Sequence, residues 1–389
     1  MRFLDKYAGL GVVALLTLLS RIFLTQNPPS FQKDNVRKVL LIKFWGLGSI
    51  LLLSPTLRQI RESLPQAKLV FFTSERNREI CQSIGLFDEI LYLEVDRGWL
   101  AFFQSLTGNI RYLIRARYDM VLDFEFFTRF STMITFFTFS PIRIGYHAWE
   151  TWRGDIHNIK VPFNRYWHIM DNFYNLVNYL GLPKHDDLIM SKPAVSHADK
   201  ALVDGMLAEK KISGKFISIH INASDLVIER RWPYDNFVEL GKRLLASHPD
   251  ITLIFIGSKS EEESVEQIIK SLGSPRAVDM VAQVSLTQLA YLFERSTLVI
   301  SNDSGPLHLA VAMETSTVSF FGPETPSMYG PRGPNHTVIF KNTDCSPCVN
   351  VHDRKSVHCR FEKPRCVTMI TVQEALEAVE GRLAAAKKT

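Results

Sequence analysis

The sequence predicts an α/β protein made of two domains, each with a parallel sheet covered by helices. Its 389 residues are enough for two domains with sizeable cores. Short apolar segments typical of buried parallel strands alternate with longer helical patterns. The alternation weakens between residues 181 and 200, where prolines and charged residues collect, and then resumes. We therefore expect two Rossmann-like halves with a ligand-binding cleft between them.

The first half opens with a strand and a glycine-containing turn. Residues 39–44 form the expected strand, and Trp45-Gly46-Leu47-Gly48-Ser49 the turn that follows it. Further strands are expected at 68–72, 89–93 and 120–124, and helices at 50–64 and 76–84.

The second half repeats the alternation. Strands are expected at 216–221, 251–256, 298–301 and 317–321, and helices at 236–247, 261–272, 286–294 and 371–387. The predicted organisation is an N-terminal segment and linker (1–36), a first Rossmann-like domain (37–185), a second one (186–370) and a C-terminal helix (371–389).

The N-terminal segment is strongly apolar. Residues 7–20 contain no charge, and after Arg21 the apolar pattern resumes. A spanning helix needs about 20 apolar residues, so this segment reaches that length only if Arg21 snorkels to the headgroups. We expect a membrane anchor that spans the bilayer or lies in its interface; a signal peptide and a plain docked helix are the alternatives. Basic residues after the segment favour a cytoplasmic main body.

The overall charge does not indicate nucleic acid. The net charge of +5 is modest for this length, and no run of four consecutive Lys or Arg residues occurs. Such a diffuse charge fits phosphate binding or an anionic membrane surface better than a nucleic-acid partner.

The sharpest local motif spans residues 302–310, Asn-Asp-Ser-Gly-Pro-Leu-His-Leu-Ala. It follows an apolar strand and opens an apolar helix, with Ser304 at the N-cap and Gly305 in the first turn. Free amides at a helix N-terminus make a phosphate site, which His308 would adjoin. The alternative interpretation is a capped helix with a packed histidine.

A second motif joins the end of the 216–221 strand to a cationic loop. His220-Ile221-Asn222-Ala223-Ser224 is followed by Glu229-Arg230-Arg231-Trp232-Pro233. Either arginine could hold a diphosphate through charge-assisted hydrogen bonds. The alternative is a solvated basic loop anchored by Trp232.

Taken in order, these motifs resemble glycosyltransferase family nine, the lipopolysaccharide heptosyltransferase family. The resemblance covers roughly residues 38–380. It also includes the Val-Leu-Leu-Ile-Lys-Phe strand with its glycine turn, Tyr118-Asp119-Met120-Val121-Leu122-Asp123, Arg143-Ile144-Gly145-Tyr146 and Phe321-Gly322-Pro323-Glu324-Thr325-Pro326.

The resemblance implies a GT-B fold with the acceptor on the first domain and a nucleotide sugar on the second. It implies inverting transfer that needs no metal or other cofactor, so protein groups must neutralise the leaving diphosphate. We expect this neutralisation from Arg230, Ser304 and the Gly305 amide. Glu261 is expected to accept hydrogen bonds from the ribose hydroxyls; the alternative is that it only begins a solvated helix. Asn222, Trp232, Asp303 and His308 complete the expected donor site; Gly46 and Gly48 belong to the acceptor-side loop.

One position departs from the family pattern. The aspartate regarded as the family's base is Ser49 here, and serine is not a competent base at neutral pH without help. Glu125 is our first hypothesis for a replacement and Asp123 the second, because both end the 120–124 strand. The third possibility is that no base remains.

Four cysteines cluster near the C-terminus. Cys345, Cys348, Cys359 and Cys366 have the spacing C-x2-C-x10-C-x6-C. Thiolates at such spacing are usual ligands of structural zinc, which we expect here. Reduced packed thiols and, in an exported domain, disulfides are the alternatives.

Residues 124–139 are unusually aromatic. Core packing explains most of this composition, and a surface that faces lipid or a lipid-linked acceptor is the alternative.

The sequence thus predicts a glycosyltransferase on the cytoplasmic face of a bacterial inner membrane. We expect it to move a sugar, heptose from ADP-heptose, to a lipopolysaccharide-type or other glycolipid acceptor. The alternative is a catalytically impaired member that binds nucleotide sugar without transfer. A nucleotide-sugar epimerase or dehydrogenase is disfavoured, because Gly46 and Gly48 lack a third glycine and no Tyr-x-x-x-Lys pair accompanies them.

Overall fold

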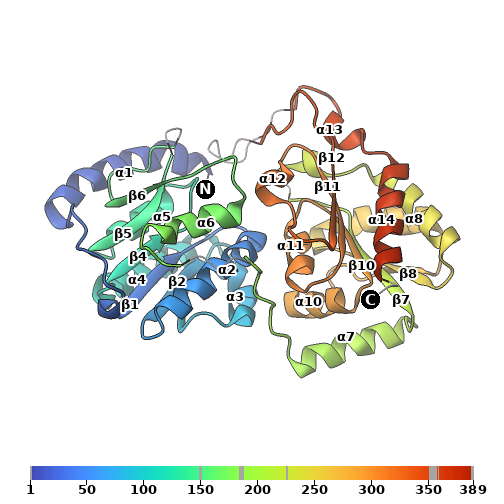
Figure 1. Cartoon of the computed structure of the whole chain (residues 1–389), viewed down its shortest axis with the longest axis horizontal. Coiled ribbons are helices and arrows are strands. Elements are labelled where there is room, and N and C mark those ends of the chain that lie inside the picture. The colour runs from blue at the N-terminus through green and yellow to red at the C-terminus, as the bar shows by residue number, and fades with distance from the viewer. Residues whose placement is uncertain are drawn as a thin grey trace. The chain divides into compact units, whose positions relative to one another are not determined.

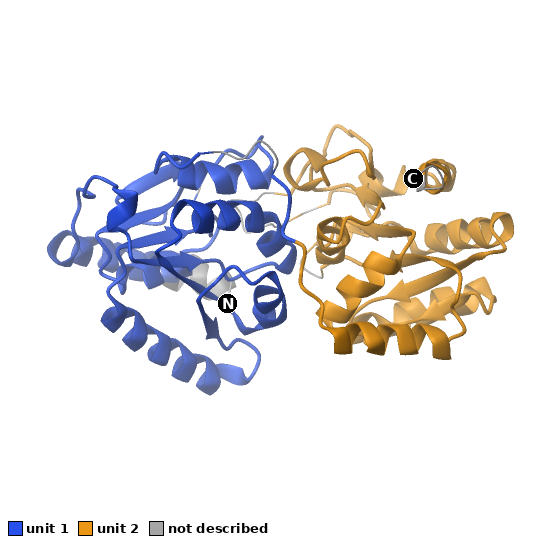
Figure 2. Cartoon of the chain, turned by 60° about the horizontal axis from the view of Figure 1, so that its bottom comes forward, with its two compact units in different colours: residues 1–191, 350–354 blue, residues 192–349, 355–389 orange. Residues whose placement is uncertain are grey.

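The computed structural model describes residues 2–148, 151–183, 188–224, 227–349, 357 and 359–386 (Figure 1). The chain forms two compact units, the first ending at Ser191 and the second beginning at Lys192 (Figure 2). Each unit contains one six-stranded parallel sheet, so the predicted α/β fold class of two Rossmann-like domains is confirmed.

The sheet of the first unit has the strand order β3-β2-β1-β4-β5-β6. The order reverses at β1, and the carboxyl ends of β1 and β4 lie side by side because Ile42 pairs with Asp123. Its strands are β1 (Lys38–Ile42), β2 (Lys68–Ser74), β3 (Glu89–Leu93), β4 (Met120–Asp123), β5 (Ile142–His147) and β6 (Ile159–Pro162).

Helices cover both faces of the first sheet. Phe102 and Leu113 of α4 pack with Ile134 of α5 on alternate side chains of β1 and β2, which places both helices on one face. The right-handed crossovers place α2 and α3 on the other face, where α6 contacts α2. These helices are α2 (Leu47–Ser63), α3 (Arg78–Ile84), α4 (Gly98–Ala116), α5 (Phe130–Phe136) and α6 (Ile169–Asn178).

The sheet of the second unit has the order β12-β11-β10-β7-β8-β9. The order reverses at β7, where ligands of such sheets usually bind beyond the carboxyl ends of the strands. The strands are β7 (Lys215–His220), β8 (Ile251–Ile256), β9 (Ala277–Asp279), β10 (Leu298–Asn302), β11 (Thr317–Phe321) and β12 (His336–Phe340).

One apolar core fills the space between the second sheet and helices α8, α9 and α14. On α8, Phe237, Leu240 and Leu244 recur at helical spacing and are all buried. Elsewhere in the unit, α10 contacts both α7 and α11. Its helices are α7 (His197–Glu209), α8 (Tyr234–Ser247), α9 (Glu262–Leu272), α10 (Leu286–Arg295), α11 (Gly305–Ala312), α12 (Pro326–Tyr329), α13 (Arg365–Thr368) and α14 (Val372–Ala386).

The N-terminal segment forms helix α1 (Arg2–Phe23), which contacts α5. Its buried Leu16 joins a small apolar cluster with Phe136 of α5 and Ile156. Among the described helices, none combines the length and apolar character that crossing a bilayer requires.

Every expected strand is present, with ends within two residues of the prediction. The glycine turn is shorter than expected, because α2 begins at Leu47 and includes Gly48 and Ser49. β5 and β6 were missed because Arg143, Gly145 and Pro162 interrupt their apolar pattern. β9 is only three residues long, and β12 is a half-buried edge strand.

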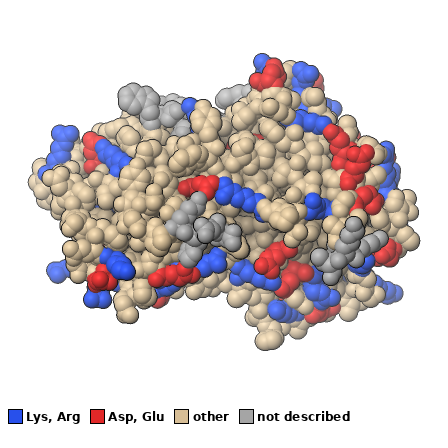
Figure 3. Space-filling view, viewed as in Figure 1, with Lys and Arg blue, Asp and Glu red and all other residues tan. Residues whose placement is uncertain are grey.

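Charged side chains are spread over the surface without a patch of one sign on the face that Figure 3 shows. Lys and Arg lie among Asp and Glu there, which agrees with a small and diffuse net charge.

Candidate active site

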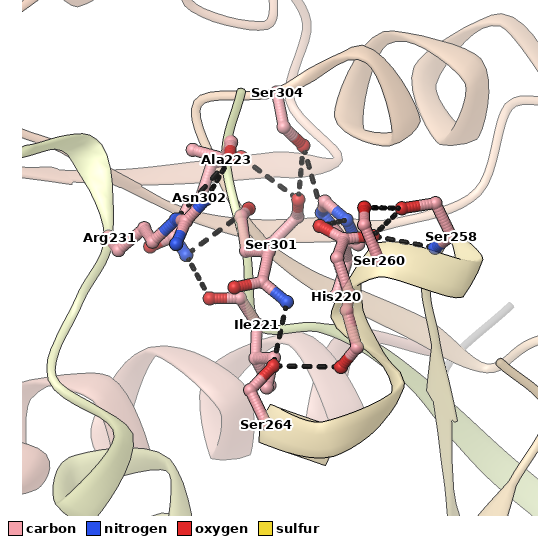
Figure 4. Close-up of polar contacts among 12 residues, drawn as sticks. His220, Ile221, Ala223, Arg231, Ser258, Ser260, Ser264, Ser301, Asn302 and Ser304 are labelled. Atoms are coloured by element: carbon pink, nitrogen blue, oxygen red, sulfur yellow. Dashed lines mark hydrogen bonds and ion pairs between the residues drawn. The ribbon is translucent and has the colours of Figure 1, made fainter. Parts of the chain in front are cut away.

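Polar side chains gather at the carboxyl ends of the central strands of the second sheet (Figure 4). His220 ends β7, and Ser301 lies opposite it near the end of β10. The Nδ1 atom of His220 lies 3.1 Å from Oγ of Ser304, and that oxygen lies 3.0 Å from Oγ of Ser301. All three residues are buried, so this network is protected from solvent.

Ser304 occupies the N-cap position of α11 without capping it. Its backbone is extended, but its side chain makes no hydrogen bond to the first helical turn. The hydroxyl is instead committed to His220 and Ser301. The sequence therefore identified the helix start correctly, and the helix amides near Gly305 are left for another acceptor. His308 lies in the first turn of α11 and is buried.

Glu261 lies beside His220 at the start of α9. Its Oε1 atom is 3.6 Å from Nε2 of His220. Its Oε2 atom accepts from the backbone N–H of Ser258 at 2.6 Å and completes a capping box. Burial raises the pKa of Glu261, but His220 and Ser258 outweigh burial and bring it down to about 2. Glu261 is thus a fixed carboxylate, not a freely solvated helix start.

Arg230 forms a buried ion-pair group with two carboxylates. Its Nε atom lies 3.2 Å from Oδ2 of Asp303, and one terminal nitrogen lies 3.6 Å from Oε2 of Glu324. Burial lowers the pKa of Arg230, but Asp303 and Glu324 outweigh it, so the pKa lies above its usual value. The structure brings together two residues expected in the donor site and adds Glu324, which the sequence marks only as part of the 321–326 turn. Because two carboxylates already face this arginine, it is a balanced cation and not an open positive pocket.

Trp232 is a core residue, which corrects its expected contact with the donor. It is fully buried, and its ring stacks on Phe320 with 4.4 Å between ring centroids. Its indole N–H donates to the carbonyl of Ile370 at 2.9 Å, and its backbone N–H to Asn302 Oδ1 at 3.0 Å. Through these contacts with the core, Trp232 holds the loop that carries Arg230 in place.

Asn222 joins two helices to the end of β7. Its Oδ1 accepts from the hydroxyl of Tyr234 at 2.6 Å, and its amide donates to Ser264 at 3.3 Å. Since only 1% of Asn222 is exposed, it positions the loop after β7 and has little surface for a ligand.

In the first unit, Gly46 makes the turn between β1 and α2. Its φ of +88° is in the region that favours glycine, and a Cβ there would lie 2.9 Å from Oγ of Ser49. Gly48 is buried in the first turn of α2, next to the half-buried Ser49. The turn thus depends on glycine at 46 and places the Ser49 hydroxyl at the carboxyl end of β1.

Glu125 stabilises this turn by hydrogen bonds to its backbone. Its Oε1 atom accepts from Lys43 Nζ at 3.0 Å and from the backbone N–H groups of Phe44 and Trp45 at 2.8 and 2.9 Å. Among the described residues, its Oε2 atom has no hydrogen-bond partner, and the side chain is fully buried. One oxygen of the hypothesised base is therefore saturated, and the other, although without a partner, is closed to solvent, so the turn must open before an acceptor hydroxyl can reach it.

Asp123 anchors a buried cation. Its Oδ2 atom pairs with Arg153 and lies 3.2 Å from Nε2 of His157, while Oδ1 accepts from the backbone N–H of Glu125 at 3.0 Å. Burial raises the pKa of Asp123, but Arg153 and His157 outweigh burial and hold it below its usual value. With both oxygens occupied, Asp123 is poorly placed to remove a proton.

Arg153 extends this anchor to the surrounding backbone. It donates to the carbonyl oxygens of Glu125, Thr128 and Tyr146, and it is fully buried. Arg153, His157 and Lys43 were not among the residues expected in the site. Lys43 could have been identified, because it is a cation in an apolar strand just before the glycine turn. Nothing in the local sequence marks Arg153 or His157 as a partner of Asp123.

The cysteine cluster does not form the expected zinc site. Among the described residues, which include all four cysteines, no group of three or more His, Cys, Asp or Glu side chains could hold a metal ion. Burial, followed by Cys348 and Cys345, raises the pKa of Cys366 to about 11, so its thiol is protonated at neutral pH. The cysteines are unpaired thiols, and His352 and His358 lie outside the described residues.

Residues 108–358 match the model of glycosyltransferase family 9 (heptosyltransferase). Lipopolysaccharide heptosyltransferase 2 of Salmonella typhimurium is 23% identical over 318 residues, which cover 78% of this chain and 87% of that protein. A family 9 glycosyltransferase structure from Veillonella parvula aligns with a TM-score of 0.76 at 17% identity, covering 92% of this chain and all of the other. The structure of E. coli ADP-heptose lps heptosyltransferase II aligns with a TM-score of 0.69 at 18% identity, covering 90% and 99%.

Proposed function

The chain belongs to glycosyltransferase family 9, the heptosyltransferase family, and is a glycosyltransferase; on this premise we propose that it transfers heptose from ADP-heptose to a lipopolysaccharide-type acceptor. The proposal includes inverting transfer without a catalytic metal, at the cytoplasmic face of the inner membrane. The names of its relatives, which include a lipopolysaccharide heptosyltransferase and an ADP-heptose-dependent one, support the donor and acceptor classes.

The observation that carries the donor assignment is the polar cluster at the start of α11. A nucleotide diphosphate leaves with negative charge, which helix amides and a cation stabilise in the transition state. Ser304 leaves those amides uncapped, and Arg230 lies beside Asp303 directly before them. In this proposal the diphosphate binds the backbone amides at the start of α11. Arg230 then donates hydrogen bonds to the phosphate with the guanidinium nitrogen that faces Glu324 in this structure.

The reaction is a single displacement at the anomeric carbon. An acceptor hydroxyl oxygen forms the new bond to that carbon as the bond to the diphosphate oxygen breaks, and the hydroxyl proton passes to a base. We assign the base to Glu125, through its Oε2 atom, because that oxygen has no hydrogen-bond partner among the described residues while Oε1 is held by three donors. Since the side chain is fully buried, this step requires the glycine turn to open towards the acceptor.

A second candidate is a member that binds nucleotide sugar without transferring it. Ser49 favours this candidate, because it replaces the carboxylate that the family pattern has at the glycine turn. Both candidates share the donor site, so donor binding alone does not separate them.

The test is isothermal titration with ADP-heptose, followed by turnover on lipopolysaccharide acceptors of increasing core length. We expect binding and turnover, with Arg230→Ala weakening donor binding at least roughly tenfold. Arg243→Ala is the matched control, because Arg243 is an exposed arginine of the same unit that pairs with Glu239. Binding without turnover on every acceptor would favour the second candidate, and no binding would reject the donor assignment.

A further inference from the structure

Helix α1 has one face packed on the first unit and one apolar face in solvent. Val13, Leu16, Thr17 and Ser20 are buried, with exposed fractions of 0% to 7%. The opposite face carries large apolar side chains whose exposed fractions run from 45% to 75%: Leu10, Leu15, Leu18, Ile22 and Phe23. A continuous apolar stripe of this kind on a protein surface marks an interaction site.

Specific contacts hold the inward face of α1 in place. The backbone N–H of Asp155 donates to Thr17 Oγ1 at 3.2 Å. Gly154, with φ of +77°, lets the chain pass so close that a Cβ there would lie 2.4 Å from the same oxygen. Arg143 donates to the carbonyl of Thr25, directly after the helix, at 2.7 Å. These contacts fit a helix that lies on the body of the unit.

Helix α4 presents a second apolar patch in the same layer. Trp99, Leu100 and Phe103 are exposed by 54% to 73%, and the Trp99 and Phe103 rings stack with centroids 6.2 Å apart. α4 and α5 cover the same face of the first sheet, and α1 packs on α5. Both α1 and α4 therefore pack around α5 on this side of the first sheet.

The charges along α4, and along α1 after Asp5, are of one sign. The sequence contains no Asp or Glu from residue 6 to 33 or from 97 to 118. Towards the C-terminal end of α4, an open surface cavity of about 420 Å³ is lined by Lys38, Arg111 and Arg115. In the described part of the chain, neither Arg111 nor Arg115 forms an ion pair. Glu89, which interacts with Lys38 and Tyr112 of the cavity, is itself paired with Lys68. Two further acids are paired as well, Asp96 with Arg76 and Asp155 with Lys160.

We propose that the outward faces of α1 and α4 form a membrane-docking surface on which the protein lies on an anionic bilayer, with α1 in the plane of the interface. Apolar side chains would enter the boundary between headgroups and acyl chains. The cationic cavity of α4 would hold a lipid phosphate, and each nearby Lys or Arg adds about 1 kcal/mol of attraction to an anionic leaflet. Charge complementarity favours this occupant over a second copy, because two copies would bring the cations of α4 together.

The inference deepens the proposed function and rests on it for the reason to bind a membrane, namely a lipid-linked acceptor. Its test needs neither donor nor acceptor. The full chain is sedimented with vesicles of equimolar phosphatidylglycerol and phosphatidylethanolamine, and with phosphatidylcholine vesicles. We expect binding to the first and roughly tenfold weaker binding to the second or in about 0.5 M NaCl.

Two variants and one control define the surface. Leu18→Glu/Ile22→Glu on α1 and Arg111→Glu/Arg115→Glu on α4 should each reduce vesicle binding at least roughly tenfold. Leu202→Glu, at an apolar residue of the second unit that is 53% exposed, should leave binding unchanged. Circular dichroism and the thermal unfolding midpoint verify that each variant is folded.

Three outcomes would overturn the inference. They are unchanged vesicle binding in both double variants, retention of bound protein through alkaline carbonate extraction as expected of a spanning helix, or no vesicle binding together with a dimer that Leu18→Glu/Ile22→Glu dissociates. Donor binding and turnover on a delipidated acceptor are measured separately, so failure here leaves the transferase proposal to be judged alone.

Discussion

Lys43 Nζ lies 3.0 Å from Oε1 of Glu125, and both side chains are fully buried. The same oxygen accepts from the backbone amides of Phe44 and Trp45, so one carboxylate holds the end of β1, a cation and the glycine turn together. A buried charge pair of this kind adds little net stability, but removing one member leaves the other charge without compensation.

Glu125→Ala should therefore lower the free energy of unfolding by about 3–5 kcal/mol, because Lys43 stays buried without a counter-charge. Urea denaturation of the purified protein measures the change. Glu89→Ala is the control, because Glu89 pairs with Lys68 at the surface and should cost about 1 kcal/mol or less. Equal losses in the two variants would contradict the bracing role of Glu125.

Glu125→Gln distinguishes the structural role of this side chain from its proposed role as the catalytic base. The amide oxygen can still accept from the turn amides, so the fold should be kept, while the base is lost. We expect donor binding to stay within about threefold and kcat to fall roughly 100-fold or more. Near-normal turnover would exclude Glu125 as the base.

Ser49→Asp in the Glu125→Gln background tests whether the glycine turn can still carry the base. Ser49 is half-buried in the first turn of α2, where a carboxylate is favourable near the helix N-terminus. We expect the double variant to recover at least roughly tenfold in kcat over Glu125→Gln. Ser49→Ala in the same background is the control, and recovery there too would show that the gain does not come from the carboxylate.

Glu261 predicts an acid-sensitive contribution to stability. Its pKa of about 2 in the folded protein lies below its usual range. Stability from this group is therefore present above about pH 4.5 and is lost as the pH falls towards 2. The difference in Tm between the wild type and Glu261→Gln should be largest near pH 6 and should shrink between pH about 4.5 and 2.5. A difference independent of pH would mean that the carboxylate charge contributes nothing.

Trp232→Ala should cost about 3–5 kcal/mol in unfolding free energy, because it opens a cavity against Phe320 and removes the bond to Ile370. Trp232→Phe should cost less and leave the ADP-heptose Kd within about threefold, provided that the ring acts only through packing. Titration calorimetry on the folded Phe variant checks this point. A large loss of affinity without loss of stability would restore Trp232 to the donor site.

The strand–helix alternation was predictable because apolar periodicity depends on local sequence. The start of α11 was predictable for the same reason: Ser304, Gly305 and Pro306 mark a helix N-terminus by their individual conformational preferences. Partners could not be predicted this way. Asp123 and Arg153 are 30 residues apart, and only the packing of β4 against the loop after β5 brings them together.

The same limit explains the errors in the expected site. Trp232 follows two arginines and so looked like part of a ligand-binding loop, but its burial depends on Phe320 of β11. The cysteine spacing indicated a metal, and the four thiols lie close enough to affect one another's pKa. Among the described residues they nevertheless do not take up an arrangement that could hold a metal ion, and spacing alone does not determine that arrangement. Ser304 occupies the expected N-cap position of α11, but its hydroxyl bonds to His220 of β7 and does not cap the helix.

Arg230 provides the last prediction, because its two carboxylates compete with a diphosphate for the same cation. Glu324 is almost fully buried, and its Oε2 atom lies 3.6 Å from Arg230. Glu324→Gln removes one negative charge next to the proposed phosphate position, so ADP should bind roughly three- to tenfold more tightly, measured by titration calorimetry.

Glu266→Gln is the control for Glu324→Gln, because it makes the same change in net charge at an exposed residue of α9 that pairs with Lys270. It should leave the affinity for ADP within about twofold, since exposed charges are screened by salt. Weaker ADP binding in Glu324→Gln would mean that this carboxylate orients Arg230 for the phosphate. The arginine would then depend on both of its partners, and the competition inferred from their distances would be wrong.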